Sequence, residues 1–151
     1  MAGESDIPYE QVLENVRRFY SESMIDHAMN PRNVGELPEA DGYASDTGDC
    51  GDRFEIWLRI KNDTITEARF WTDGCAAQIA CGSTVTEIIK GKPLTEIHRL
   101  TARQVVNALG GLPEENKHCA LRAVAVVKEA VKDAILNGRE PWRKGYRKRQ
   151  G

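Results

Sequence analysis

Residues 53–72 read RFEIWLRIKNDTITEARFWT and carry the clearest strand pattern of the chain. In the first half, Phe54, Ile56 and Leu58 alternate with charged residues or tryptophan, and the second half alternates in the same way around Phe70. A period of two places every second side chain on one face of a strand. We therefore predict an antiparallel hairpin with one apolar face and one face toward solvent.

The register of this hairpin follows from the requirement that the apolar faces of the two strands match. A three-residue loop at 62–64 satisfies it and is acceptable for a hairpin. Two strands alone are marginally stable, so we expect a third strand over 43–49. The predicted cross-strand pairs are Leu58–Ala68, Ile56–Phe70, Arg59–Glu67 and Trp57–Arg69.

Helical periodicity covers most of the remaining chain. We predict one amphipathic helix from Tyr9 to about His27, and a second from Cys75 to the Lys-Gly-Lys-Pro stop at 90–93. A short helix at 101–109 and a final one from Cys119 to Asn137-Gly138 complete the set. The expected architecture is α+β: a small antiparallel sheet of about three strands, helices packed on one face, and a metal or cluster site at one end.

Length and composition limit the classes of protein that this chain resembles. With 151 residues, 40% hydrophobic, 29% charged and a net charge of −2, it suits one globular domain with no general attraction for nucleic acid or membranes. The N-terminus lacks a signal peptide and no apolar run approaches the ~20 residues of a membrane helix, so we expect a cytoplasmic protein. We assign residues 1–138 to the domain and 139–151 to a basic, mobile C-terminal tail. If the tail docks a partner, we expect a protein rather than nucleic acid.

Three cysteines lie at junctions between predicted elements, beside glycine, carboxylate or imidazole: Cys50 in GDCGD, Cys75 in DGCAA and Cys119 in KHCAL. A reducing compartment disfavours the alternative of disulfides. Helix N-termini favour the thiolate, so we expect lowered pKa values at Cys75 and Cys119. Separations of 25 and 44 residues, without a C-x-x-C pair, argue against zinc fingers and ferredoxin loops.

Three thiolates with a labile fourth ligand, Asp52 or His118, would bind an iron–sulfur centre or zinc and still release it. Plainer roles stay open: Asp52 could cap a turn, His118 could have no function, Cys50 could be a free thiol and Cys75 a core residue. His118 and Cys119 are adjacent on a helix, so their side chains should point apart and form a poor nucleophile–base pair.

The remaining candidates have structural interpretations. Cys81 lies inside a helical apolar pattern and should be buried without a ligand role. His27 and His98 should be structural or exposed.

Together these motifs resemble the iron–sulfur cluster assembly scaffolds, the family of IscU and of the N-terminal domain of NifU. The resemblance covers about residues 12–137 and rests on six segments in family order. They are DH at 26–27, NPRNVG at 30–35, CGD at 50–52, TDGC at 72–75, STVTE at 83–87 and HC at 118–119.

The resemblance implies that Cys50, Cys75 and Cys119 ligate a transient [2Fe–2S] cluster, with Asp52 keeping it labile and His118 as ligand or modulator. It also implies that a cysteine desulfurase supplies sulfur as persulfide, with Cys119 as the candidate acceptor. Apo iron–sulfur proteins would receive the cluster, zinc could fill the site without iron, and the chain could form a homo-oligomer. Such a protein is a carrier rather than an enzyme.

Two alternatives come from other classes: a zinc-bound sulfurtransferase resembling SufU, and a binding module stabilised by zinc. The chain also departs from the family at 112–117, where LPEENK replaces the Leu-Pro-Pro-Val-Lys motif at which a chaperone docks. We therefore do not predict chaperone-driven release through that motif.

Overall fold

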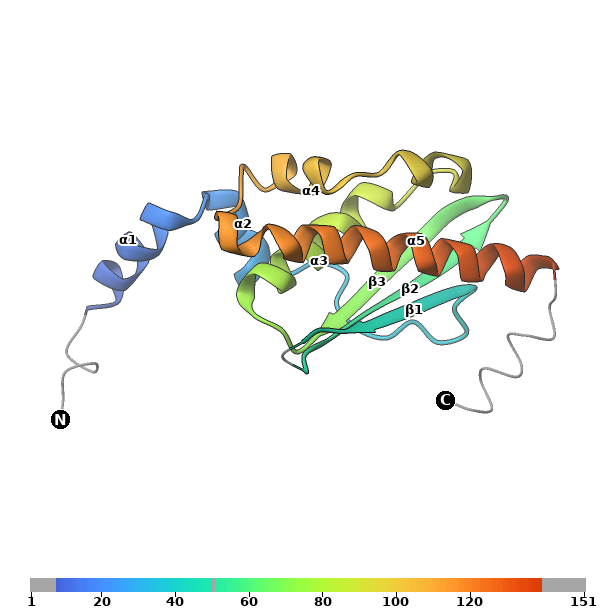
Figure 1. The fold of residues 1–151 in the computed structure, drawn as a ribbon, viewed down its shortest axis with the longest axis horizontal. Coiled ribbons are helices and arrows are strands. Elements are labelled where there is room, and N and C mark those ends of the chain that lie inside the picture. The colour runs from blue at the N-terminus through green and yellow to red at the C-terminus, as the bar shows by residue number, and fades with distance from the viewer. Residues whose placement is uncertain (1–7, 50, 140–151) are drawn as a thin grey trace.

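The computed structural model describes residues 8–49 and 51–139, which form a three-stranded sheet with helices over one face (Figure 1). The predicted α+β architecture is confirmed. Two 3₁₀ segments, η2 and η3, were not expected from the sequence. The elements in chain order are α1 (Tyr9–Phe19), α2 (Glu22–Met29), β1 (Gly42–Thr47), β2 (Arg53–Lys61), β3 (Thr64–Thr72), α3 (Ala76–Ile89), η2 (Leu94–Arg99), α4 (Ala102–Ala108), η3 (Glu114–Asn116) and α5 (Lys117–Arg139).

The strands are antiparallel in the order β1-β2-β3, and all four predicted cross-strand pairs are present. The three-residue loop is wrong, however. Asn62 and Asp63 alone form the turn, with φ of 53° and 58°, and a register shift follows between Arg59 and Ile60. Two left-handed residues match the twist of a hairpin, and the bulge restores the predicted register beyond it. The third strand is confirmed, but it ends at Thr47.

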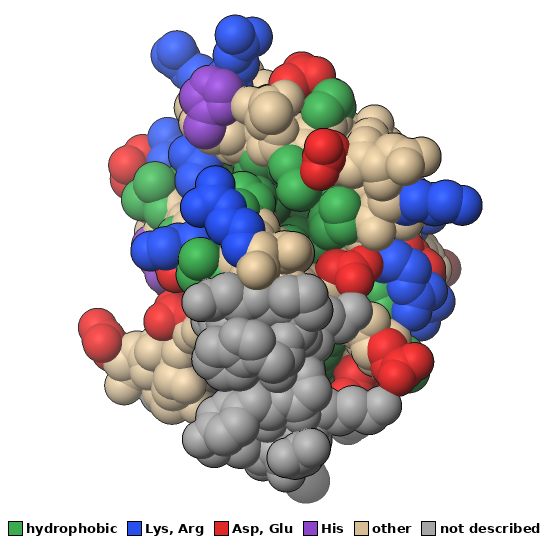
Figure 2. Space-filling model, turned by 90° about the vertical axis from the view of Figure 1, so that its right-hand side faces the viewer, with side chains coloured by type: hydrophobic (Ala, Val, Ile, Leu, Met, Phe, Trp, Pro, Cys, Tyr) green, Lys and Arg blue, Asp and Glu red, His purple; other side chains and the backbone are tan. Residues whose placement is uncertain are grey.

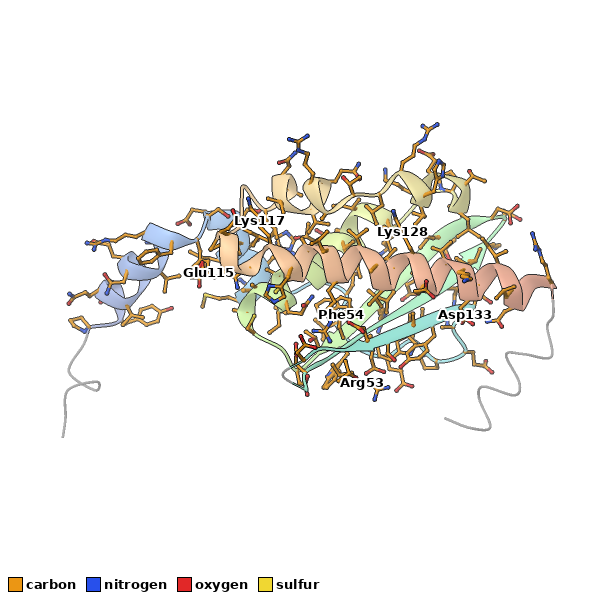
Figure 3. All side chains as sticks on the ribbon, viewed as in Figure 1. Arg53, Phe54, Glu115, Lys117, Lys128 and Asp133 are labelled. Atoms are coloured by element: carbon orange, nitrogen blue, oxygen red, sulfur yellow. The ribbon has the colours of Figure 1, made fainter. Side chains whose placement is uncertain are left out.

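The apolar face of the hairpin is the centre of the core. Phe54, Ile56 and Leu58 have no exposed surface, and the rings of Phe54 and Phe70 stack with centroids 6.1 Å apart. Figure 3 shows Phe54 pointing from the sheet toward the helices, while Arg53 points away. Burial of each such side chain contributes about 1.5–3 kcal/mol.

Two glycines let the long helices approach the sheet closely. A Cβ at Gly82 of α3 would lie 2.4 Å from the ring of Phe70 in β3. A Cβ at Gly42 of β1 would lie 2.3 Å from the carbonyl oxygen of Ala130 in α5. These contacts fix the positions of the two helices that begin at the cysteine segments.

The single N-terminal helix predicted for residues 9–27 is wrong. The chain leaves helical geometry at Tyr20, and Ser21 begins α2 as its N-cap, accepting a hydrogen bond from the Met24 amide at 3.0 Å. The Ser21 hydroxyl also donates to the carbonyl oxygen of Leu109. Helix α1 extends from the body of the molecule, and its Phe19 side chain is 72% exposed (Figure 1).

The other helices follow the prediction with small shifts. Thr101 begins α4 with a capping box completed by Gln104. Helix α5 continues through Asn137 and Gly138 rather than ending there, because the buried Asn137 amide donates to the Asp41 carbonyl oxygen at 2.9 Å and so does not end the helix. Among the described residues, no helix has the length and apolarity needed to cross a membrane.

Candidate functional site

Four of the five predicted site residues lie in the described structure, on three segments that meet at one end of the sheet (Figure 1). Asp52 precedes β2, Cys75 is the N-cap of α3, and His118 and Cys119 are in the first turn of α5. The start of β2 pairs with the end of β3, so Asp52 lies beside the segment that leads to Cys75. Cys50 lies outside the described residues.

The two described site thiols are neighbours with different exposure. The Cys75 side chain is exposed, whereas Cys119 is only 1% exposed. His118 Nε2 lies 3.6 Å from Cys119 Sγ, so the prediction that these adjacent side chains point apart is wrong. The imidazole is within hydrogen-bonding distance of the sulfur.

The pKa of Cys119 differs from the sequence expectation. Burial raises the pKa of its thiol to about 12, the neighbouring Cys75 thiol adds to that rise, and the Arg122 charge opposes it. The desolvation of a buried thiolate therefore outweighs the helix N-terminus that predicted a lowered pKa. A bound metal ion would supply the positive charge that favours the thiolate.

The Asp52 carboxylate is bound by Arg122 and lies close to two glycines. Arg122 Nη1 donates to Asp52 Oδ2 at 2.7 Å, and this hydrogen bond lowers the pKa of the carboxyl against the opposing effect of burial. On the other sides are two glycines: a Cβ at Gly48 would lie 2.6 Å from Oδ1, and a Cβ at Gly74 would lie 2.9 Å from Oδ2. Asp52 is therefore an ionised carboxylate in contact with the residue that precedes Cys75.

A set of hydrogen bonds fixes the segment that leads into α3. The Arg53 amide donates to Asp73 Oδ1 at 2.7 Å, and the Gly74 amide donates to Thr72 Oγ1 at 3.0 Å. The buried Gln78 side chain then joins α3 to α5, since its Nε2 donates to the Cys119 carbonyl oxygen at 3.2 Å. These bonds hold the starts of the two helices together.

The three residues predicted to be structural lie as expected. Cys81 is completely buried in the core. His27 Nδ1 is 2.7 Å from Ser83 Oγ, in a contact between α2 and α3. His98 is exposed and lies against the Thr95 carbonyl oxygen.

Sequence reasoning missed Arg122, which has the largest number of polar contacts at this end of the molecule among the described side chains. The available signal was its spacing: a residue three positions after Cys119 lies on the same face of a helix. Its partners are 70 and 76 residues earlier in the chain, so no local pattern identifies them.

A surface groove of about 480 Å³ lies elsewhere, between η2 and the second half of α5. Figure 2 views the molecule from this end and shows apolar side chains near the centre with basic side chains beside them. The groove contains none of the predicted site residues, so we do not assign the site to it. It is lined by Leu94, Thr95, Ile97, His98, Lys128, Val131, Lys132, Ile135, Leu136 and Arg139.

The described donors are two thiols, an imidazole and a carboxylate, a set that suits zinc or an iron–sulfur centre. Among residues 8–49 and 51–139, however, no three cysteine, histidine or acidic side chains already form a metal-binding group. The described residues alone therefore do not provide a complete coordination shell.

Comparison with known proteins identifies a family, related sequences and a related structure that agree with one another. The family described as NifU-like N terminal domain matches residues 19–137. An iron-sulfur cluster assembly scaffold protein IscU of Archaeoglobus fulgidus is 41% identical over 116 residues, which is 76% of this chain and 75% of the relative. The IscU scaffold of Aquifex aeolicus is 39% identical over 120 residues, 78% of this chain and 76% of the relative. The crystal structure of a NifU-like N-terminal protein from Brucella abortus superposes with a TM-score of 0.63 at 17% identity, covering 79% of this chain and 96% of that one.

Proposed function

The chain belongs to the NifU-like N-terminal domain family, and from this premise we propose that it is a scaffold for iron–sulfur cluster assembly and transfer. Relatives named as such scaffolds match more than three quarters of the chain. The observation that carries the proposal is the meeting of Cys75, Cys119, His118 and Asp52 at one end of the sheet.

We propose that the cargo is a [2Fe–2S] cluster held by Cys50, Cys75 and Cys119, with Asp52 or His118 as the fourth ligand. Thiolates are the usual ligands of such clusters, and an oxygen or nitrogen donor in the fourth position is easier to exchange. Zinc suits the same donors. Cys50 is included among the proposed ligands because it lies two residues before Asp52 in the sequence.

Sulfur would arrive from a cysteine desulfurase as a persulfide, with Cys119 as the acceptor. The Cys119 thiolate attacks the outer sulfur, a new S–S bond forms, and the desulfurase cysteine leaves as a thiolate. His118 is close enough to take the Cys119 proton. Because Cys119 is buried, the donor must first displace the groups that cover it.

The test is anaerobic reconstitution with ferrous iron, cysteine and a cysteine desulfurase, followed by measurement of iron, zinc and acid-labile sulfide per chain. We expect equal iron and sulfide in the parent protein, and none in Cys50→Ser, Cys75→Ser or Cys119→Ser. The matched control is Cys81→Ser, which should load normally. Zinc without sulfide in the parent protein would contradict the scaffold proposal and favour a zinc-bound sulfurtransferase.

Release of the cluster depends on Asp52 in this proposal. Asp52→Ala should slow transfer to an apo-acceptor, because it removes the oxygen ligand that exchanges most easily. Transfer kinetics identical to those of the parent protein would contradict this role of Asp52.

A further inference from the structure

Arg122 is a largely buried cation at the end of the molecule where the candidate ligands meet. It follows Cys119 by one helical turn of α5, and its side chain is only 11% exposed. Nε donates to Asp46 Oδ2 at 3.0 Å and Nη1 to Asp52 Oδ2 at 2.7 Å. Nη2 donates to the carbonyl oxygens of the same two residues, both at 2.8 Å. One guanidinium thus binds the end of β1, the start of β2 and α5.

The guanidinium keeps its charge at all ordinary pH values. A charge that is this well buried requires paired carboxylates, and Asp46 and Asp52 provide them. Asp46 is the more exposed of the two carboxylates, at 52% against 26% for Asp52, so Asp52 is the better-shielded partner.

The oxygen that Arg122 binds is the one nearest the segment before Cys75. Gly74 faces Oδ2 of Asp52, whereas Gly48 faces Oδ1. A metal ion held by Cys75 and Cys119 would approach Asp52 from the Gly74 side. It would then meet an oxygen that already accepts a charge-assisted hydrogen bond.

We propose that Arg122 competes with the metal for the Asp52 carboxylate and so makes Asp52 an exchangeable ligand. This inference rests on the proposed function. Asp52 moves between two partners: it binds the metal when the site is loaded and returns to Arg122 when the cluster leaves. The return contact stabilises the open coordination position, which is where an acceptor thiolate can enter. Arg122 acts through Asp52 and is a positioning residue.

The expected change in metal affinity follows from the hydrogen bond between Arg122 and Asp52, which metal coordination by Asp52 would weaken. A hydrogen bond to a charged group is about twice as strong as one between neutral groups. Removal of the Arg122 charge should therefore strengthen metal binding about tenfold, which corresponds to about 1.4 kcal/mol, provided that Asp52 is present.

The experiment measures the zinc affinity of the full chain by competition with a chromophoric chelator. The variants are Arg122→Met, Asp52→Ala and the double variant, with Arg53→Met as control. Arg53 is the residue next to Asp52, and its side chain bonds Tyr43 and Glu55 rather than the Asp52 carboxylate. Arg122→Gln, which keeps hydrogen-bond donors without the charge, carries the same prediction if Arg122→Met does not fold. Cluster loss to a chelator is the second readout on the same proteins.

We expect tighter zinc binding and slower cluster loss in Arg122→Met, and no change in Arg53→Met. Arg122→Lys should restore part of the parent behaviour, because lysine keeps the charge but not the planar fork. The double variant should match Asp52→Ala, since the proposed competition requires that carboxylate. Unchanged or weaker binding in Arg122→Met would overturn the inference, as would tightening that persists without Asp52.

The two proposals fail in different ways. A parent protein that takes up neither cluster nor zinc contradicts the proposed function, and the competition at Asp52 is then contradicted with it. A parent protein that assembles and transfers a cluster, with Arg122 variants that bind zinc no more tightly and release the cluster no more slowly, contradicts only the role of Arg122.

Discussion

Substitution of Gly82 by alanine tests whether α3 is fixed by its close approach to the sheet. The added Cβ would lie 2.4 and 2.6 Å from two ring atoms of Phe70. Phe70 is itself buried and stacked on Phe54, so its ring has no free space into which to move. The helix must therefore shift away from β3.

Two effects of opposite sign determine the change in the free energy of unfolding. Overpacking in a core typically costs about 1–3 kcal/mol and occasionally more. Replacement of glycine by alanine inside a helix returns up to about 1 kcal/mol. With contacts this short we take the upper part of the first range and predict a net loss of about 2 kcal/mol. That corresponds to a fall in Tm of roughly 4–8 °C for a chain of this size.

Gly138→Ala is the matched control, because Gly138 also lies in a helix but has no atoms within 4 Å of its Cβ position. It should leave stability unchanged or raise it by at most about 1 kcal/mol. The measurement is urea unfolding followed by circular dichroism, with a chelator present because metal binding would add stability. Equal free energies of unfolding for the two variants would refute the claim that Gly82 sets the distance between α3 and the sheet.

Three further predictions concern cysteine and histidine side chains. Cys81→Ser should lower metal-free stability by about 1–3 kcal/mol, since it places a hydroxyl in the apolar core, and should leave the zinc content unchanged by elemental analysis. Alkylation with iodoacetamide should modify Cys75 before Cys119, because Cys75 is exposed and Cys119 is buried. Mass spectrometry that found the reverse order would contradict the buried position of Cys119. Burial lowers the pKa of His27. The folded chain should therefore lose stability as pH falls below about 6.5, where the histidine of the unfolded chain gains a proton. His27→Asn should reduce that loss, as measured by urea unfolding at pH 7 and pH 5.

The hairpin could be predicted because the residues that determine it are close together in the sequence. Alternation in Phe54, Ile56 and Leu58 requires one buried face, and parity then fixes the pairing with β3. The turn was not predictable at the same level. Asn62 and Asp63 adopt left-handed conformations and form a turn one residue shorter than predicted. A β-bulge accommodates the extra residue, so the predicted pairing is kept beyond it.

The N-terminal region shows where periodicity fails. The apolar spacing continues across Tyr20 and Ser21, so it predicts one helix. The break depends on Ser21, whose hydroxyl caps α2 and bonds the carbonyl oxygen of Leu109, 88 residues away. A contact that distant leaves no signal in the local pattern.

The meeting of the site segments was predicted from their places at element junctions, and the structure brings Cys75, Cys119, His118 and Asp52 together. The state of Cys119 could not be predicted, because its raised pKa depends on packing rather than on its position in the helix. Arg122 was missed because its carboxylate partners come from another part of the chain. The role of Cys50 stays a prediction from sequence.

Transfer of a loaded cluster to an apo-ferredoxin is the strongest test of the proposed scaffold function. The parent protein is loaded anaerobically, freed of excess iron and sulfide, and mixed with the acceptor in the presence of a chelator that captures free iron. Visible circular dichroism then follows the cluster on the acceptor. We predict that the acceptor gains a [2Fe–2S] cluster despite the chelator, because the cluster moves intact between the proteins. An acceptor that stays empty while the chelator takes up the iron would contradict it.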